Sequence, residues 1–205
     1  MRKTDTIDHL LEVNEFAWSL YNSNPVNAAK RNMNAQDIKI LIGNFERNQV
    51  QYLLIGGFAM AFHGHVRATN DIDLWIKNTP ENMGRLRQAL LDTGINEARA
   101  LRDTTQLVGR FTMFNLLESD FKVDLLHNLK GFKEVDFDKC FEQAKISDYH
   151  GIKIPVLRAE DLLFEKKQTA REKDSGDISF LERLLSRFNP KEKPGDSGRD
   201  DRGQE

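Results

Sequence analysis

Apolar residues follow two different spacings along this chain. Helical spacing, with apolar positions three or four residues apart, predicts helices over 6–21, 35–47, 58–63, 80–93, 137–145 and 159–187. The last segment is predicted to break into two helices near Ser175-Gly176. Short apolar runs bounded by turn residues predict strands over 51–55, 71–76, 106–117 and 121–126, and a hairpin over 146–156. Helices and strands are therefore interleaved, which predicts an α/β or α+β fold with one mixed sheet flanked by helices.

The chain length favours one domain with short appendages, because 205 residues are enough for a single core. Residues 1–34 are predicted to form an N-terminal helix and an Asn-rich connector, and residues 35–188 the domain with its C-terminal helices. Residues 189–205 contain no large apolar side chain that could anchor them, so we expect a disordered tail.

Composition narrows the classes of function and the compartment. Thirty basic and 32 acidic residues give a net charge of -2, which does not favour a nucleic-acid coat protein or a polybasic membrane binder but leaves a local basic groove open. The mean hydropathy is -0.58, and no apolar stretch is long enough to span a bilayer. Because Cys140 is the single cysteine, we expect no intramolecular disulfide and no thiolate zinc site. These features predict a cytoplasmic protein without a membrane partner.

The most informative segment is 71–76, which reads DIDLWI. Side chains alternate along a strand, so Asp71 and Asp73 share one face while the apolar residues between them point into the core. Two adjacent carboxylates repel each other unless a cation lies between them, and hard oxygen ligands suit Mg²⁺ or Mn²⁺. For an isolated Asp-x-Asp, the alternative is a solvated strand face or a pair of turn residues.

Two further segments favour a metal and phosphate site over that alternative. Upstream, an apolar strand ends at Gly56-Gly57 and leads into a short helix, and glycines at such a turn let the backbone approach a phosphate closely. Downstream, Asp124 lies on the strand 121–126 and faces opposite to its apolar neighbours. If this strand lies beside 71–76, three carboxylates converge, as a site for two metal ions requires.

The order of these elements resembles the DNA polymerase beta-like nucleotidyltransferase superfamily. Its pattern is a Gly-Gly or Gly-Ser turn after a strand, a short helix, an acid-x-acid strand and a third acid on a later strand. The corresponding residues here are Gly56, Gly57, Asp71, Asp73 and Asp124. Residues 63–70 and 160–181 are also similar to segments of stand-alone bacterial nucleotidyltransferases, including abortive-infection type toxins. The resemblance covers residues 51–185 in separate blocks.

This resemblance implies a role for each matching residue. Asp71 and Asp73 would bind both metal ions, and Asp124 would complete one of the sites and help to deprotonate the acceptor hydroxyl. The backbone at Gly56 and Gly57 would hold the triphosphate of the incoming nucleotide. Many members of the superfamily have a serine after the first glycine, whereas this chain has Gly57, so only backbone donors remain at that position.

The basic residues near these segments have two open interpretations. Arg67, just ahead of the acids, could pair with them or with the triphosphate, or it could form an ion pair that fixes its own loop. Lys167, Arg171 and Lys173 match the basic helix of the resembling family and are candidates for phosphate contacts. They also lie among many acidic residues, a pattern that is typical of a solvated helix face with ion pairs.

The sequence therefore predicts a metal-dependent nucleotidyltransferase with Mg²⁺ or Mn²⁺ as its cofactor. It would transfer a nucleoside monophosphate from a nucleoside triphosphate to an acceptor hydroxyl on an RNA 3′ end, a protein or a small molecule, and release pyrophosphate. A cognate antitoxin-like protein is a further candidate partner. One alternative is a catalytically silent nucleotide-binding or interaction module of the same fold, such as part of a toxin–antitoxin pair. A metal-dependent phosphoesterase that uses the same acids is the other.

Overall fold

The computed structural model describes residues 4–21, 34–100, 112–117, 119, 121–133 and 135–188. Its α-helices are α1 (Thr4–Tyr21), α2 (Ala35–Arg47), α3 (Gly56–Phe62), α4 (Pro80–Asp92), α5 (Asp136–Glu142), α6 (Ala159–Thr169) and α7 (Ser175–Phe188). Its strands are β1 (Tyr52–Ile55), β2 (Asp71–Ile76), β3 (Thr112–Asn115), β4 (Lys122–Leu126), β5 (Lys145–Tyr149) and β6 (Ile152–Val156). Two short 3₁₀ helices are η2 (Asn96–Ala100) and η4 (Glu172–Asp174).

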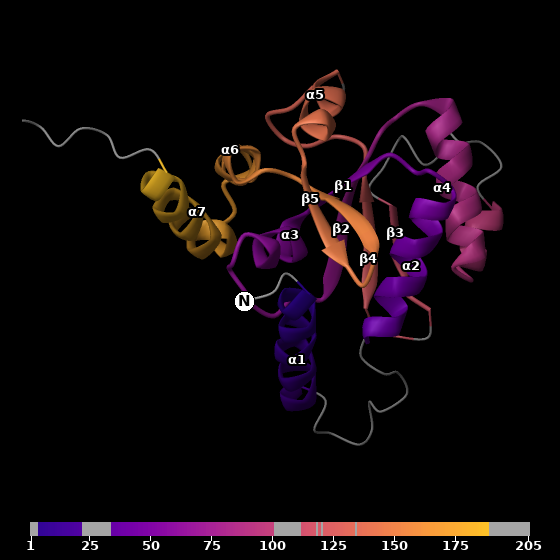
Figure 1. Ribbon diagram of the computed structural model, residues 1–205, viewed down its shortest axis with the longest axis horizontal. Coiled ribbons are helices and arrows are strands. Elements are labelled where there is room, and N and C mark those ends of the chain that lie inside the picture. The colour runs from indigo at the N-terminus through magenta and orange to yellow at the C-terminus, as the bar shows by residue number, and fades with distance from the viewer. Residues whose placement is uncertain are drawn as a thin grey trace, which may run out of the picture.

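The strands of the described residues form one mixed six-stranded sheet in the order β3-β4-β2-β1-β6-β5. β1 pairs antiparallel with β2 and parallel with β6, and β2 pairs parallel with β4. The outer pairs β3–β4 and β5–β6 are antiparallel. Figure 1 shows α3, α6 and α7 on one side of the sheet and α2 and α4 on the other. This arrangement confirms the predicted fold class, a mixed sheet flanked by helices.

Local sequence signals set where two of these helices begin. α2 starts with a capping box, in which Oδ1 of Asn34 accepts hydrogen bonds from the first turn and the Asp37 carboxylate accepts one from the Asn34 N–H. α4 starts after Thr79, whose hydroxyl accepts a hydrogen bond from the Asn82 N–H. Pro80 follows as the first helical residue, where its missing N–H has no intrahelical partner to lose.

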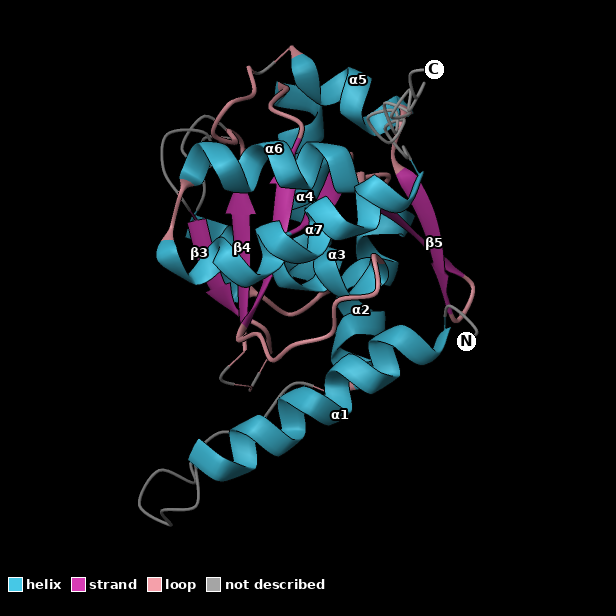
Figure 2. Cartoon of the chain, turned by 90° about the vertical axis from the view of Figure 1, so that its left-hand side faces the viewer, coloured by secondary structure: helices cyan, strands magenta, loops and turns pink. Residues whose placement is uncertain are grey.

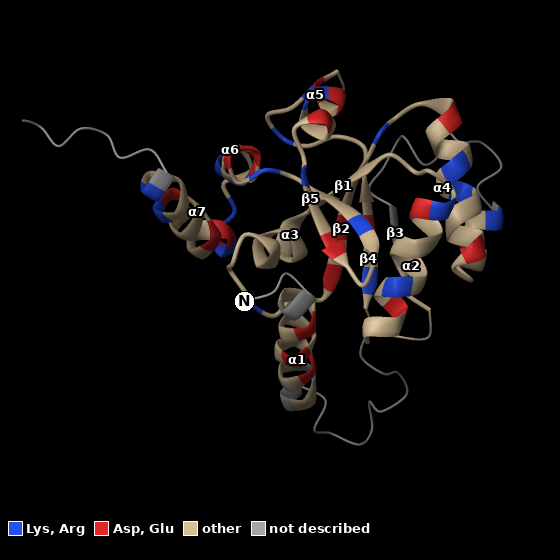
Figure 3. Ribbon diagram, viewed as in Figure 1, with Lys and Arg blue, Asp and Glu red and all other residues tan. Residues whose placement is uncertain are grey.

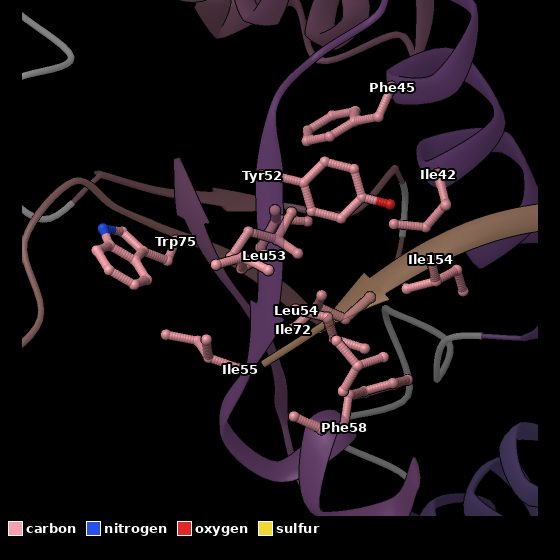
Figure 4. Close-up of a cluster of buried hydrophobic side chains, with 14 of the residues drawn as sticks. Ile42, Phe45, Tyr52, Leu53, Leu54, Ile55, Phe58, Ile72, Trp75 and Ile154 are labelled. Atoms are coloured by element: carbon pink, nitrogen blue, oxygen red, sulfur yellow. The ribbon is translucent and has the colours of Figure 1, made fainter. Parts of the chain in front are cut away.

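The core is centred on β1 and β2. All four residues of β1 are buried, and Phe45 of α2 packs edge-on against Tyr52 with 5.4 Å between the ring centroids. Figure 4 shows this contact together with Phe58 of α3 and Trp75 of β2, which belong to the same buried cluster. Asp71 and Asp73 are the polar residues of the otherwise apolar strand β2.

Most predicted boundaries lie within two residues of the observed ones, and three differences affect how the elements connect. The helix expected from residue 58 begins at Gly56, so the two glycines are its first turn. The helix expected over 137–145 ends at Glu142, because Lys145 already belongs to β5. The break expected near Ser175-Gly176 falls at Ala170, which takes a left-handed φ of +51°.

Several sequence predictions lie outside the described residues. These are the connector over 22–33, the first part of the strand expected over 106–117 and the tail over 189–205. Figure 2 shows that α1 runs along one end of the molecule and that its far end projects beyond the other helices. Among the helices that the structure describes, each is too short or too polar to cross a membrane.

Candidate active site

Three carboxylates meet where β2 and β4 lie side by side. The parallel register places Asp73 directly opposite Asp124, and Asp71 lies two residues earlier on the same face of β2. One carboxylate oxygen from each of the three residues lies within 4.8 Å of the others. Figure 3 shows the acidic positions of β2 within the sheet. The expected neighbourhood of these two strands is thus confirmed.

These carboxylates are electrostatically unfavourable as a group. Burial raises the pKa of Asp73 to about 7, and the charges of Asp71 and Asp124 add to the increase. Burial also raises the pKa of Asp124 to about 6, with a further contribution from Asp71. Oδ1 of Asp124 is buried and has no hydrogen-bond partner among the described residues. A purely oxygen donor set with one unpartnered buried oxygen fits a hard divalent cation such as Mg²⁺ or Mn²⁺.

The glycine turn lies against these acids. Gly56 has a φ of +62°, and a Cβ added there would lie 1.8 Å from Oδ2 of Asp73. A Cβ added at Gly57 would lie 2.7 Å from Oγ1 of Thr69. Both contacts are far too short, so the turn approaches Asp73 and Thr69 as closely as it does only because both residues are glycine. A serine at position 57 would require Thr69 to move.

Thr69 orients the first carboxylate. Its hydroxyl lies 2.8 Å from Oδ1 of Asp71 and donates a hydrogen bond to it, and Thr69 itself is buried. The hydrogen bond fixes one oxygen of Asp71 and leaves the other available for a ligand. From the sequence alone, Thr69 is expected to make no more than a hydrogen bond within its own loop.

The acids and the glycine turn share one cavity of about 460 Å³. It is bounded by the start of α3, the loop before β2, the two acid-bearing strands and the segment from α6 to η4. Its lining residues are Ile55, Gly56, Gly57, Arg67, Ala68, Thr69, Asn70, Asp71, Asp73, Asp124, Leu126, Leu129, Glu165, Lys166, Arg171, Lys173 and Asp174. The candidate residues Asp71, Asp73, Asp124, Gly56, Gly57, Arg67 and Arg171 therefore come together at one place.

Arg67 lines the cavity but forms an ion pair with an acid outside the carboxylate cluster. Its Nε and terminal nitrogen donate to the two carboxylate oxygens of Asp177 at 2.9 and 2.8 Å. Burial alone would raise the pKa of Asp177, but the hydrogen bonds from Arg67 and Lys166 outweigh burial and lower it to about 2. This bidentate ion pair holds the loop before β2 against α7. It is the second of the two interpretations from the sequence, in which Arg67 forms an ion pair that fixes its own loop.

A buried lysine lies at the centre of this charge network. Nζ of Lys166 is 3.0 Å from Oδ1 of Asp174 and 2.8 Å from Oδ2 of Asp177, and all three side chains are only 2% exposed. Arg171 donates to Asp174 from its Nε at 2.7 Å. The network therefore joins α6, η4 and α7 behind the cavity wall.

Lys167 is the candidate that the structure does not bring to the cavity. Its Nζ pairs with Glu182 at 2.6 Å, and both side chains are about half exposed, whereas the neighbouring Lys166 lines the cavity. The sequence carries no clear signal for this difference, because Lys166 follows Leu162 and Lys167 follows Leu163 at the same helical spacing. In the structure Leu162 and Lys166 lie on the buried face of α6.

Comparisons with solved structures give distant similarities only. A candidate nucleotidyltransferase from Thermotoga maritima is 16% identical, with 78% of this chain and 98% of that chain covered and a TM-score of 0.43. The lincosamide antibiotic adenylyltransferase LnuA, in its lincomycin-bound structure, is also 16% identical, with 75% and 99% covered and a TM-score of 0.43. The antibiotic-resistance factor ANT(2'')-Ia is 15% identical, with 75% and 83% covered and a TM-score of 0.45. Scores this low support no statement about substrates.

The family comparison is more informative. No curated protein matches this chain at a significant level. Residues 34–193 match the family described as "Nucleotidyl transferase of unknown function (DUF2204)". The matched range includes the glycine turn, all three acids and the segment from α6 to α7. The chain therefore belongs to this family and is a nucleotidyltransferase, as its resemblance to the polymerase beta-like superfamily implied.

Proposed function

We propose that this protein is a metal-dependent enzyme that transfers a nucleoside monophosphate from a nucleoside triphosphate to an acceptor hydroxyl. The observation that carries the proposal is the convergence of Asp71, Asp73 and Asp124 beside a glycine turn in one cavity. The unpartnered buried oxygen of Asp124 supports a cation at this point, because a buried polar atom without a partner is unfavourable.

The three acids would hold Mg²⁺ or Mn²⁺. When bound, these ions offset the negative charge of the acids and the triphosphate and polarise the phosphate oxygens. Asp124 would accept the proton of the acceptor hydroxyl, since its carboxylate lies directly beside Asp73 where the three acids converge. The hydroxyl oxygen then bonds to the α-phosphorus while the bond to the β-phosphate breaks, and pyrophosphate leaves.

The triphosphate would lie along the glycine turn and the basic wall, which is the part of the cavity lining that carries Arg67, Arg171 and Lys173. Backbone N–H groups at Gly56 and Gly57 are the proposed donors there, since no side chain separates them from the ligand. Arg67, Arg171 and Lys173 line the same cavity and supply positive charge. We propose Lys166 in place of Lys167 as the lysine of this wall, because Lys167 faces away.

Leu126, Leu129 and Glu165 also line the cavity and are proposed to contact the acceptor. A cavity of about 460 Å³ has room for a hydroxyl on an RNA 3′ end, a protein side chain or a small molecule. The near-zero net charge favours the two acceptor classes without a long phosphate backbone. We also propose a cytoplasmic location, in keeping with the single buried Cys140, and leave an antitoxin-like protein as a partner to be sought.

The test is a labelling experiment. The protein is incubated with Mg²⁺ and each α-³²P-labelled nucleoside triphosphate, together with tRNA, lysate protein or the small-molecule fraction of a lysate. We expect label to enter one of these fractions and to be absent with the Asp71→Ala/Asp73→Ala variant. Labelled monophosphate without acceptor labelling would instead show a phosphoesterase. Metal-dependent nucleotide binding without turnover on any fraction would show a silent module.

A further inference from the structure

The N-terminal helix reaches the acids through a chain of two hydrogen bonds. Asn14 of α1 is only 4% exposed, and its Oδ1 accepts a hydrogen bond from the Thr69 N–H at 2.8 Å. The Thr69 hydroxyl in turn donates to Oδ1 of Asp71 at 2.8 Å. A helix at the start of the chain is therefore connected to the first carboxylate of the site.

α1 is held firmly enough on the domain to transmit this constraint. Ile7 and Leu10 are 1% and 0% exposed, and together with Asn14 they form a stripe at helical spacing. The Tyr149 hydroxyl of β5 also lies 3.2 Å from Oδ1 of Asp8. Among the side chains of α1 whose burial is described, Asn14 is the buried polar one. Asn14 therefore makes a hydrogen bond to the loop before β2, whereas Ile7 and Leu10 make apolar packing contacts.

The surroundings of Asn14 do not favour it on stability alone. Its Nδ2 is buried and has no hydrogen-bond partner among the described residues, which is unfavourable for folding. An apolar residue would avoid that unpaired donor but would leave the Thr69 N–H unpaired. The side-chain amide of Asn14 is therefore explained by the hydrogen bond that it accepts from the Thr69 N–H in the loop before β2. Thr69 also lies close to the glycine turn, since a Cβ added at Gly57 would be 2.7 Å from its Oγ1.

We propose that Asn14 is a positioning residue, through which α1 fixes Thr69 so that the Thr69 hydroxyl holds Asp71 in the orientation that binds a divalent cation. This inference rests on the proposed function. It goes beyond the family domain, because α1 lies outside the matched residues 34–193. The catalytic domain thus depends for its metal ligand on a helix that the family match does not include.

The test uses the full chain and two readouts other than activity. In the metal-free protein, amide hydrogen exchange is measured over residues 66–73, and the dissociation constant for Mn²⁺ is measured by calorimetry. Asn14→Ala is expected to accelerate exchange in this segment and to weaken Mn²⁺ binding about tenfold, the usual lower range for a group that orients a metal ligand. Asn14→Asp keeps an acceptor for the Thr69 N–H, so it should restore the protection from exchange.

Leu10→Ala is the matched control, because it loosens the packing of α1 while keeping Asn14. It should lower the melting temperature and leave Mn²⁺ affinity within about twofold of wild type. The proposal is overturned if Asn14→Ala leaves either the exchange of residues 66–73 or the Mn²⁺ affinity unchanged, or if Leu10→Ala weakens Mn²⁺ binding as much as Asn14→Ala does. If the wild type binds no Mn²⁺, the proposed function fails, and the exchange rates alone then decide whether Asn14 holds this loop.

Discussion

At the scale of single residues, Gly56 and Gly57 are determined by side chains that follow them in the chain. Asp73 and Thr69 occupy the space where a Cβ of either glycine would lie. The glycines at 56 and 57 are therefore required by the positions of the Asp73 and Thr69 side chains. A side chain at either position would require Asp73 or Thr69 to move.

Gly56→Ala should reduce nucleotidyl transfer by about 100-fold, because a displacement of about 1 Å at reacting groups has that effect. The new Cβ would force the Asp73 carboxylate away from its position, and φ is positive as well. Gly57→Ser should cost less, about tenfold, since Thr69 can rotate away at the expense of its bond to Asp71. Steady-state kinetics checks both, with Gly84→Ala on α4, where a Cβ meets nothing within 4 Å, as the control. Full activity of Gly56→Ala would contradict the close approach.

Asp73→Asn should stabilise the metal-free protein, and more at pH 8 than at pH 5. Burial raises the pKa of Asp73 to about 7 from its ordinary value of 3.8, so folding favours the protonated form. The stability that this carboxyl contributes is therefore present below its unfolded pKa and is lost as the pH rises through about 7. We expect a gain at pH 8 that exceeds the gain at pH 5 by at least about 1 kcal/mol, or about 2–4 °C in melting temperature.

Thermal unfolding in the presence of a chelator measures this difference. Asp148→Asn is a useful comparison, because hydrogen bonds from Lys153 and the Gly151 N–H lower the pKa of Asp148. That substitution should not stabilise the protein at either pH. An Asp73→Asn variant that is less stable than wild type at pH 8 would show that this carboxylate is well accommodated without a cation.

The three acids could be predicted from the sequence because side chains alternate strictly along a strand. Only one further assumption was needed, namely that the two strands are neighbours in the sheet. The partner of Arg67 could not, since Asp177 is more than one hundred residues away and nothing local distinguishes it from Asp174. The roles of Thr69 and Asn14 could not be predicted from the sequence for the same reason. Their roles depend on tertiary contacts between a loop and a helix that no spacing rule connects.

At the scale of elements, the segment from α6 to α7 is organised around Lys166. This lysine pairs with Asp174 of η4 and Asp177 of α7, and the same two aspartates also pair with Arg171 and Arg67. The two aspartates hold three cations in place along the basic side of the cavity. The network thus holds basic side chains in place at the cavity and also connects α6 to α7.

Lys166→Met should destabilise the protein by about 3–5 kcal/mol, because it leaves buried carboxylates without their central cation. It should also reduce transfer activity, since the basic wall loses its support. Lys167→Met is the matched control one residue away, and its exposed pair with Glu182 should contribute less than about 1 kcal/mol. Chemical denaturation of both variants tests this. Equal destabilisation by the two substitutions would contradict the assignment of Lys166 to the network.

The sequence predicted two helices in this segment but placed their break too late. Ser175-Gly176 is a stronger turn signal than Ala170, yet the chain breaks at Ala170 in a left-handed conformation. The early break lets η4 bring Asp174 back to Lys166, eight residues before it. A tertiary ion pair has here overridden a local preference.

At the scale of the molecule, the fold joins two remote segments into one chemical site. β2 and β4 are neighbours in the sheet although β3 and α4 separate them in sequence. The glycine turn and the segment from α6 to η4 then close the cavity from the other directions. The pairing of β2 with β4 was an expectation from the sequence, because the order of the elements resembles a known pattern, and the register confirms it. The acceptor could not be predicted, since the cavity wall that receives it carries no comparable pattern.

The central claim is that the acids bind divalent cations and thereby bind a nucleoside triphosphate. Calorimetric titration with each of the four α,β-methylene nucleoside triphosphates tests it most directly, because no acceptor is needed and no transfer can occur. Wild type and Asp73→Asn are compared with Mg²⁺ and with a chelator. We expect wild type to bind at least one analogue with Mg²⁺ and at least about tenfold more weakly without it, and the variant to show no effect of the metal. Binding that is equal with and without Mg²⁺, or equal in the variant, would contradict the account.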